Sequence, residues 1–133
     1  MNEAVIVLLT LSYSLILGII VAQVILTAPV VFKVLDNENA SKFLRAIFPR
    51  YYLLLFLICL VVSLISYLWF SAIDTWIALT ASMLAFIGFI IIPVTNSARD
   101  RGWNKLFKIL HNISVLNTII LFIIAVAQLV RIS

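Results

Sequence analysis

The chain has 133 residues, of which 65% are hydrophobic and 11% are charged, with a formal net charge of +4. A soluble domain carries roughly 25% charged residues, and a soluble fold of this size could not bury so much apolar surface, because small domains expose much of theirs. The composition therefore excludes a soluble enzyme, a nucleic-acid-binding domain, a disulfide scaffold and a disordered tail.

Four long stretches of the chain contain no charged residue, at 4–32, 51–73, 75–98 and 109–130. A membrane-spanning helix needs about 20 mostly apolar residues, and each stretch is longer than that. In lipid the backbone must be satisfied by a helix or a closed barrel, and these stretches lack the alternation of barrel strands. We therefore expect an all-α fold, an integral membrane four-helix bundle that forms a single domain over residues 1–133.

The first stretch follows an acidic residue, Glu3, and is too long for the apolar core of a signal peptide, so we expect it to remain in the mature protein. Gln23 and Thr27 are four residues apart and therefore share one face of this helix. Pro29 follows them and removes one helix hydrogen bond.

The segment between the first two stretches has an amphipathic pattern over residues 39–48. Its apolar residues recur at helical spacing, opposite Lys42 and Arg45. This pattern predicts a short amphipathic helix on the cytoplasmic face, with basic residues directed to anionic inner-leaflet lipids. Pro49 is expected to end that helix. The residues placed at the membrane interface are Arg50, Tyr51, Tyr52 and, in the second basic segment, Trp103.

The orientation in the membrane follows from the distribution of lysine and arginine. Segments 33–50 and 99–108 together hold eight of the nine basic residues. We therefore expect both segments in the cytoplasm and both termini outside it, in a multi-pass protein of the inner membrane. On the outer side, Asp74 is expected to be an exposed charge whose removal is tolerated.

Polar residues inside or beside the spans gather toward the basic side. They are Gln23, Thr27, Asn96, Arg99, Asp100, His111, Ser114 and Asn117. Because the segment 99–108 is short, the third and fourth helices should be antiparallel neighbours, and we expect Asp100 to accept a hydrogen bond from His111. The cluster is either a site for a ligand or ion or a set of polar contacts that hold the helices together.

The sequence contains few residues that could hold a metal. A protein-built metal site needs three or four ligands, and the chain has one histidine, one cysteine and two methionines. We expect no metal site. No phosphate-binding, HExxH or GxSxG motif is present, and no catalytic residue is predicted. His111 is interpreted as a structural hydrogen-bonding group or, alternatively, as an axial ligand of haem.

Three segments carry a resemblance to a known family: TAPVVFKVL at 27–35, FPRYY at 48–52, and PVTNSARD with LFKILHNISVLN at 93–117. They resemble a small family of four-helix membrane proteins known only as a domain of unknown function, whose animal relative is transmembrane protein two-hundred-and-five. The family has no settled activity to transfer. The resemblance implies these characteristic positions: Pro29, Phe32, Pro49, Tyr51, Tyr52, Asn96, Arg99, Asp100, His111, Ser114 and Asn117.

From these features we expect a small inner-membrane protein that binds or transports a small solute or ion near its cytoplasmic face. Four helices leave little room for a translocation path, so a homo-oligomer is expected. One alternative is a haem-pathway membrane oxidoreductase, or a haem-binding protein, that uses His111. Another is a structural membrane subunit that has no site.

Overall fold

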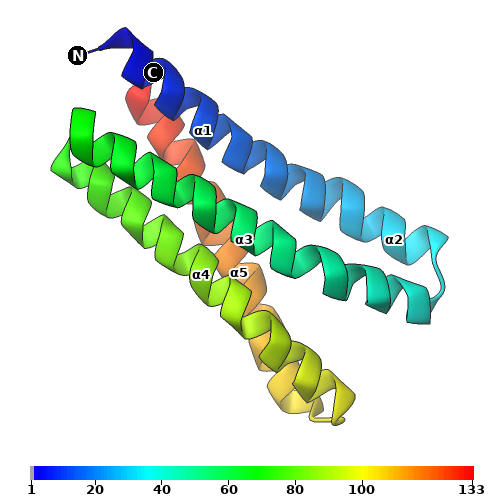
Figure 1. The fold of residues 1–133 in the computed structure, drawn as a ribbon. Helices are drawn as coiled ribbons and strands as arrows, with labels where there is room; N and C mark the ends of the chain where they lie inside the picture. The colour runs from blue at the N-terminus through cyan, green and yellow to red at the C-terminus, as the bar shows by residue number, and fades with distance from the viewer. Residues whose placement is uncertain (1) are drawn as a thin grey trace.

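The computed structural model describes residues 2–133, and these residues contain helices and no strand. The helical elements form four rods (Figure 1). In chain order they are α1 (Glu3–Val21), the π-helix η1 (Ala22–Thr27), α2 (Ala28–Val34), α3 (Asn37–Trp69), α4 (Ala72–Asp100) and α5 (Asn104–Ile132). The first three elements are continuous and make one rod, so the all-α prediction is confirmed.

Each of the four rods is long and apolar enough to cross a membrane. Their outward faces are apolar too, as Leu11, Leu57, Ile87 and Ile123 illustrate, all of which are exposed. A soluble protein rarely exposes apolar patches of such extent, whereas lipid solvates them. The chain is therefore a multi-pass membrane protein.

Short polar signals set the ends of the rods. Asp36 has an extended backbone and accepts a hydrogen bond from the amide of Asn39 at 2.8 Å, which caps α3. Ser71 caps α4 in the same way, through the amide of Asp74. Gly102 has a φ of +71°, the left-handed conformation that commonly ends a helix, and it makes the tight turn between α4 and α5.

The predicted short amphipathic helix is not a separate element. Residues 39–48 are the first turns of α3, and the helix continues through Pro49 to Trp69. Ala40 is buried because α2 packs against this part of α3. Phe43 on the apolar face is exposed, and Leu44, Ile47 and Phe48 are half-buried, so protein covers this face only in part.

Each rod packs against two others, with α3 and α4 in the most extensive contact, α5 against α4 and α1, and α1 against α3. Small residues on α4 explain the close approach of α3, since they let two backbones come near each other in a membrane. These small residues form a stripe along α4 and are all buried: Ala78, Ala81, Ser82, Ala85 and Gly88.

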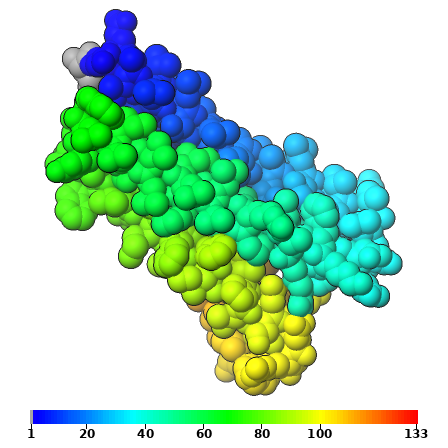
Figure 2. Space-filling view, viewed as in Figure 1, coloured from blue at the N-terminus to red at the C-terminus, as the bar shows by residue number. Residues whose placement is uncertain are grey.

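The bundle is tight at one end and forked at the other (Figure 1). The tight end, here called the terminal end, holds both chain termini and the α3–α4 turn. At the opposite end, residues 22–50 form one arm and residues 93–110 form the other. Figure 2 shows the two arms as separate protrusions. Both basic segments lie in the arms, so we call this the basic end.

The termini share one end of the bundle, and the basic segments lie at the other. We expect the basic end in the cytoplasm, because Lys and Arg bias the orientation of short loops. A phosphatase that is active only outside the cytoplasm should therefore be active when it is fused after Ser133. A fluorescent protein that matures only in the cytoplasm should stay dark at this position, and fluorescence would contradict the topology.

Candidate functional site

A layer of polar side chains crosses the bundle interior near the point where the arms separate. Its members come from three rods: Gln23 from η1, Tyr51 and Tyr52 from α3, and Asn117 and Thr118 from α5. We call this set the polar layer. The prediction that the two tyrosines lie at the membrane interface is wrong, because both rings are buried in the core.

The members lie at similar depths along the bundle. With a helical rise of 1.5 Å per residue, Gln23 is about 30 Å from the start of α1 and Tyr51 is about 27 Å from the end of α3. Asn117 is about 22 Å from the end of α5 by the same measure. Because these helix ends all lie at the terminal end, the layer is nearer to the basic end.

Tyr52 connects α3 to α5. Its hydroxyl lies 3.1 Å from the Thr118 hydroxyl and 3.4 Å from the Ser114 carbonyl oxygen. The ring is accommodated by Gly88 on α4, where an added Cβ would lie 2.4 Å from a Tyr52 ring carbon. Asn117 connects α5 to α4, since its amide nitrogen donates to the Leu84 carbonyl at 2.8 Å.

Three buried atoms of the layer have no hydrogen-bond partner within residues 2–133. They are Gln23 Nε2, Tyr51 Oη and Asn117 Oδ1. Gln23, Tyr51 and Asn117 are each more than nine-tenths buried. The Tyr51 ring packs against the Tyr52 ring, with 4.8 Å between the ring centres. A buried polar group without a partner is costly, by about 1–3 kcal/mol. Such groups in a folded protein call for an explanation.

The backbone is irregular at the same level. The six residues of η1 form a π-helix, in which the Ala28 amide donates to the Gln23 carbonyl five residues back. Pro29 explains the irregularity, because its ring clashes with the carbonyl four residues earlier and it has no N–H to donate. π-Turns within α-helices are frequent at functional sites.

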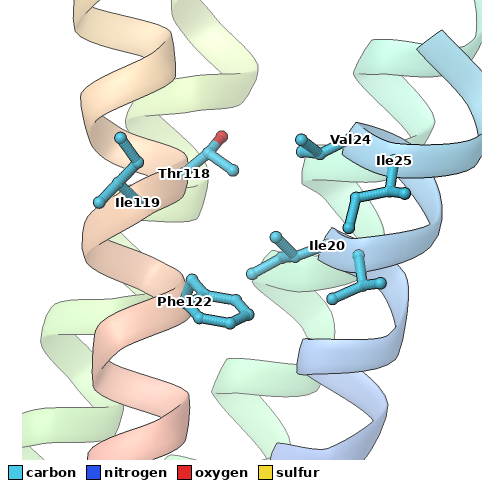
Figure 3. A pocket seen from close by; sticks show the side chains of 7 residues that line it. Ile20, Val24, Ile25, Thr118, Ile119 and Phe122 are labelled. Atoms are coloured by element: carbon cyan, nitrogen blue, oxygen red, sulfur yellow. The ribbon is translucent and has the colours of Figure 1, made fainter. Parts of the chain in front are cut away.

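A cavity of about 230 Å³ lies between η1 and α5 beside the polar layer (Figure 3). Its walls are apolar except for Thr118, whose hydroxyl contacts Tyr52. Several of its walls, including Val24, Ile25 and Ile119, are exposed on the outer surface of the bundle. The cavity therefore opens to the lipid-facing surface and adjoins the polar layer only at Thr118.

The structure divides the polar cluster predicted from the sequence. Gln23 and Asn117 belong to the layer, Ser114 contributes its carbonyl, and Thr27 is half-buried on η1. The other four lie in the α4–α5 arm. The Arg99 guanidinium lies over the Phe107 ring, 5.6 Å from its centre, and Phe107 stacks on His111. Asn96 is half-buried and lines a second cavity.

The expected hydrogen bond between His111 and Asp100 is not formed. Asp100 instead accepts two hydrogen bonds from the Arg45 guanidinium, one of them at 2.8 Å. His111 is exposed on α5. The physical reason is that an arginine guanidinium donates to both carboxylate oxygens at once. The first turns of α3 bring Arg45 from one arm to Asp100 on the other. Asp100 lies beyond the uncharged stretch of α4, and these hydrogen bonds hold its pKa below the usual range.

A second buried polar group lies at the terminal end, where the sequence predicts only an exposed charge. Asp74 is 1% exposed, so that prediction is wrong. Its carboxylate accepts hydrogen bonds from Gln128 at 2.9 Å and from Arg131 at 3.4 Å, and it also contacts the hydroxyl of Ser71. Gln128 reaches Tyr13 on α1 at 3.4 Å. This cluster joins α1, α4 and α5.

The spacing of some of these residues in the sequence indicates that they act together. Arg131 follows Gln128 by three residues, so the two side chains share a face of α5. Ser71 and Asp74 have the spacing of a capping box, in which serine and an acidic residue satisfy each other's backbone. Thr118 follows Ser114 by four residues and therefore shares its face of α5, whereas no comparable signal identifies Tyr13.

Among the described residues, no three His, Cys, Asp or Glu side chains lie close enough together to hold a metal ion. Cys59 is a free, buried cysteine in the core of α3. The polar layer contains no charged side chain. Its chemistry is that of neutral hydrogen-bond donors and acceptors, which suits an uncharged partner.

The pattern of the sequence also matches a known family. The family model described as a domain of unknown function (DUF4149) matches residues 11–104, from the third turn of α1 to the start of α5. No curated protein and no solved structure matches the chain. Since the family match covers well over half of the chain, this four-helix membrane protein belongs to the DUF4149 family.

Proposed function

We propose that this protein binds a small uncharged solute between its helices, at the polar layer. The observation that carries the proposal is the set of three buried polar atoms on three rods that have no partner within residues 2–133. A solute with a hydroxyl, amide or carbonyl group would supply those partners. The layer lies toward the basic end, so with the expected topology the solute is bound nearer to the cytoplasmic face.

The cavity between η1 and α5 supports this proposal, because it opens the lipid-facing surface of the bundle beside the layer, at Thr118. The absence of charge in the layer favours a neutral solute over an ion, since an ion in a low-dielectric interior needs opposite charge or many oxygen ligands. The π-helix at Gln23 supports the proposal independently, as a local departure from regular structure at the same level.

A purely structural role would explain only some of the layer. Tyr52 and the Asn117 amide nitrogen bond to neighbouring helices, as polar residues that hold membrane helices together do. Gln23 Nε2 and Tyr51 Oη make no such bond among the described residues. The two kinds of group therefore predict opposite effects of mutation.

The two adjacent tyrosines provide a matched pair for this test. Tyr52→Phe removes the bond to Thr118 and should lower the free energy of unfolding by about 1 kcal/mol. Tyr51→Phe removes a buried hydroxyl without a partner and should leave stability unchanged or raise it by up to about 1 kcal/mol. Thermal unfolding in mild detergent measures both. Equal destabilisation by the two variants would indicate that the Tyr51 hydroxyl, like that of Tyr52, has a hydrogen-bond partner within the protein, and would contradict the proposal.

Binding is tested with a panel of uncharged solutes, namely polyols, ureas, amides and phenols, added to the purified protein. At least one should raise the melting temperature of the wild type and not that of a Gln23→Leu, Tyr51→Phe double variant. Ser63→Ala is the control, because Ser63 is buried but bonds within its own helix. A panel without effect on the wild type, or with equal effects on all three proteins, would contradict the proposal.

Two finer parts of this proposal rest on the sequence. The placement in an inner membrane rests on the distribution of basic residues. Kinship with the transmembrane protein two-hundred-and-five family rests on the three motif segments that span residues 27–117. Transport of the solute, rather than binding alone, would need the two arms to move, and the fork is the part of the bundle where the rods diverge (Figure 1).

A further inference from the structure

A second cavity lies on the α3–α4 seam of the fork, apart from the polar layer. Its volume is about 290 Å³, and it is lined by Pro49, Phe89, Ile90, Ile92, Pro93 and Asn96. All of these except Asn96 are apolar. Ile90 and Pro93 are exposed on the surface of the bundle, so this cavity is also open to lipid.

An ion pair lies one helical turn beyond this cavity, toward the basic end. Arg45 precedes Pro49 by four residues on α3, and Asp100 follows Asn96 by four residues on α4. Residues four apart lie on the same helix face, so Arg45 and Asp100 are at the edge of the cavity. Their hydrogen bonds join the two arms across the fork.

We propose that this seam binds one anionic phospholipid, with an acyl chain in the cavity and the phosphate on Arg45 in place of Asp100. The order of the groups supports it. Apart from Pro49 on α3, the apolar lining belongs to the uncharged stretch of α4, and Asp100 lies just beyond that stretch. A phospholipid presents the same order, with its chain in the hydrocarbon and its phosphate at the interface.

Arg45 is suited to exchange one anion for another. A guanidinium binds phosphate with the same two-pronged geometry as a carboxylate. Both side chains of the present pair are partly exposed, and exposed ion pairs contribute little to stability. Breaking the pair to admit a phosphate therefore opposes binding only weakly.

Three other basic residues of this end already have partners. Lys42 is paired with Glu38 at 2.7 Å. Arg99 lies over Phe107, and Arg101 lies over Trp103. Arg50, next to Pro49, donates to the Ala46 carbonyl of its own helix at 2.6 Å, and Arg45 is the basic residue joined to Asp100 at the edge of the cavity.

The charge of the surroundings favours an anionic lipid over a zwitterionic one. The two basic segments carry eight lysines and arginines, against three acidic residues, Asp36, Glu38 and Asp100. A net positive surface attracts anionic headgroups, by about 1 kcal/mol for each basic residue near them. It repels the choline or ethanolamine group of a zwitterionic lipid.

The test is native mass spectrometry of the full chain in mild detergent, titrated with phosphatidylglycerol or phosphatidylcholine. We expect phosphatidylglycerol to bind more tightly, with one site that saturates. Arg45→Gln should weaken that binding about fivefold or more. Lys42→Gln, which removes the same charge from the same helix, should weaken it less. Equal binding of the two lipids, or equal losses in the two variants, would overturn the proposal.

Asp100→Asn gives the reverse signature. It frees Arg45 and should tighten phosphatidylglycerol binding, whereas Glu38→Gln makes the same change of charge at Lys42 and should have a smaller effect. An equal gain in both variants would show general electrostatic attraction without a site. Excess inorganic phosphate should not displace the lipid, because it has no acyl chain, and full displacement would point to a simple anion site instead.

A photoreactive phosphatidylglycerol with a diazirine on its acyl chain gives a second, independent measurement. After illumination, the label should be found on α4 at residues 89–96. Labelling that is spread evenly over the outer faces of all four rods would contradict a defined site, even if the Arg45 variant did not fold. The proposal does not depend on solute binding at the polar layer, because the two tests involve different residues and different probes.

Discussion

Replacing Asp74 by alanine should destabilise the protein strongly, by about 3 kcal/mol. The carboxylate is buried and receives hydrogen bonds from Gln128 and Arg131. Its removal leaves the buried Gln128 amide without this acceptor. The variant also loses the contact of the carboxylate with Ser71, which caps α4. The measurement is the unfolding midpoint in a graded detergent mixture.

Asp100→Ala is the matched control, since it removes the same group from the other end of α4. Asp100 is exposed, and its pair with Arg45 is accessible to solvent, so the midpoint should change little. Asp74→Asn should be intermediate, because it keeps the shape and one acceptor oxygen but loses the charge. Greater damage from Asp100→Ala than from Asp74→Ala would mean that the terminal cluster has no stabilising role.

Replacing Gly88 by alanine should be the most damaging single-methyl change in the core. The new Cβ would lie 2.4 Å from a Tyr52 ring carbon, closer than side chains pack. The ring or α4 must therefore move, and overpacking of this kind costs about 1–3 kcal/mol. Displacement of the ring also weakens the bond between Tyr52 and Thr118. Thermal unfolding in mild detergent gives the size of the effect.

Gly18→Ala is the control for helix propensity. An added Cβ at Gly18 on α1 has no atom within 4 Å, and alanine is a better helix former than glycine by about 1 kcal/mol. This variant should therefore be at least as stable as the wild type. In a Tyr52→Leu background, the penalty of Gly88→Ala should shrink, because the clashing ring is gone. A penalty that persists unchanged would locate the strain elsewhere in the α3–α4 contact.

Much of the candidate site could be anticipated only as a set of residue types. Gln23, Ser114 and Asn117 are polar groups within apolar helices, so the sequence marks them as exceptional. The structure then assigns each a different role. Asn117 bonds to α4, Ser114 contributes only its backbone carbonyl, and Gln23 is buried with its amide nitrogen unpaired.

Residue spacing was a poor guide to partners across the bundle. Asp100 and His111 are close in sequence and lie on neighbouring helices, yet Asp100 pairs with Arg45, 55 residues away. The first turns of α3 belong to the same rod as its membrane-spanning part, and this continuity brings Arg45 to the fork. A proline does not always end a helix, since Pro49 lies inside α3.

The sequence by itself determined the number of the spans. Apolarity summed over about 20 residues decides whether a segment enters lipid, and that sum is independent of what the segment packs against. Three of the four uncharged stretches accordingly lie within single rods of the structure, whereas 51–73 runs through the α3–α4 turn into α4. The polar caps at Asp36 and Ser71 are local signals of the same kind.

Only the tertiary structure decided which face of each helix is buried. In water, polar residues mark the exposed face of a helix, but in a membrane the exposed face is as apolar as the core. No periodicity therefore separates Tyr52, which is buried, from Leu53, which is exposed. The burial of Asp74 and the Arg45–Asp100 pair depend in the same way on how the rods are rotated and where the fork opens.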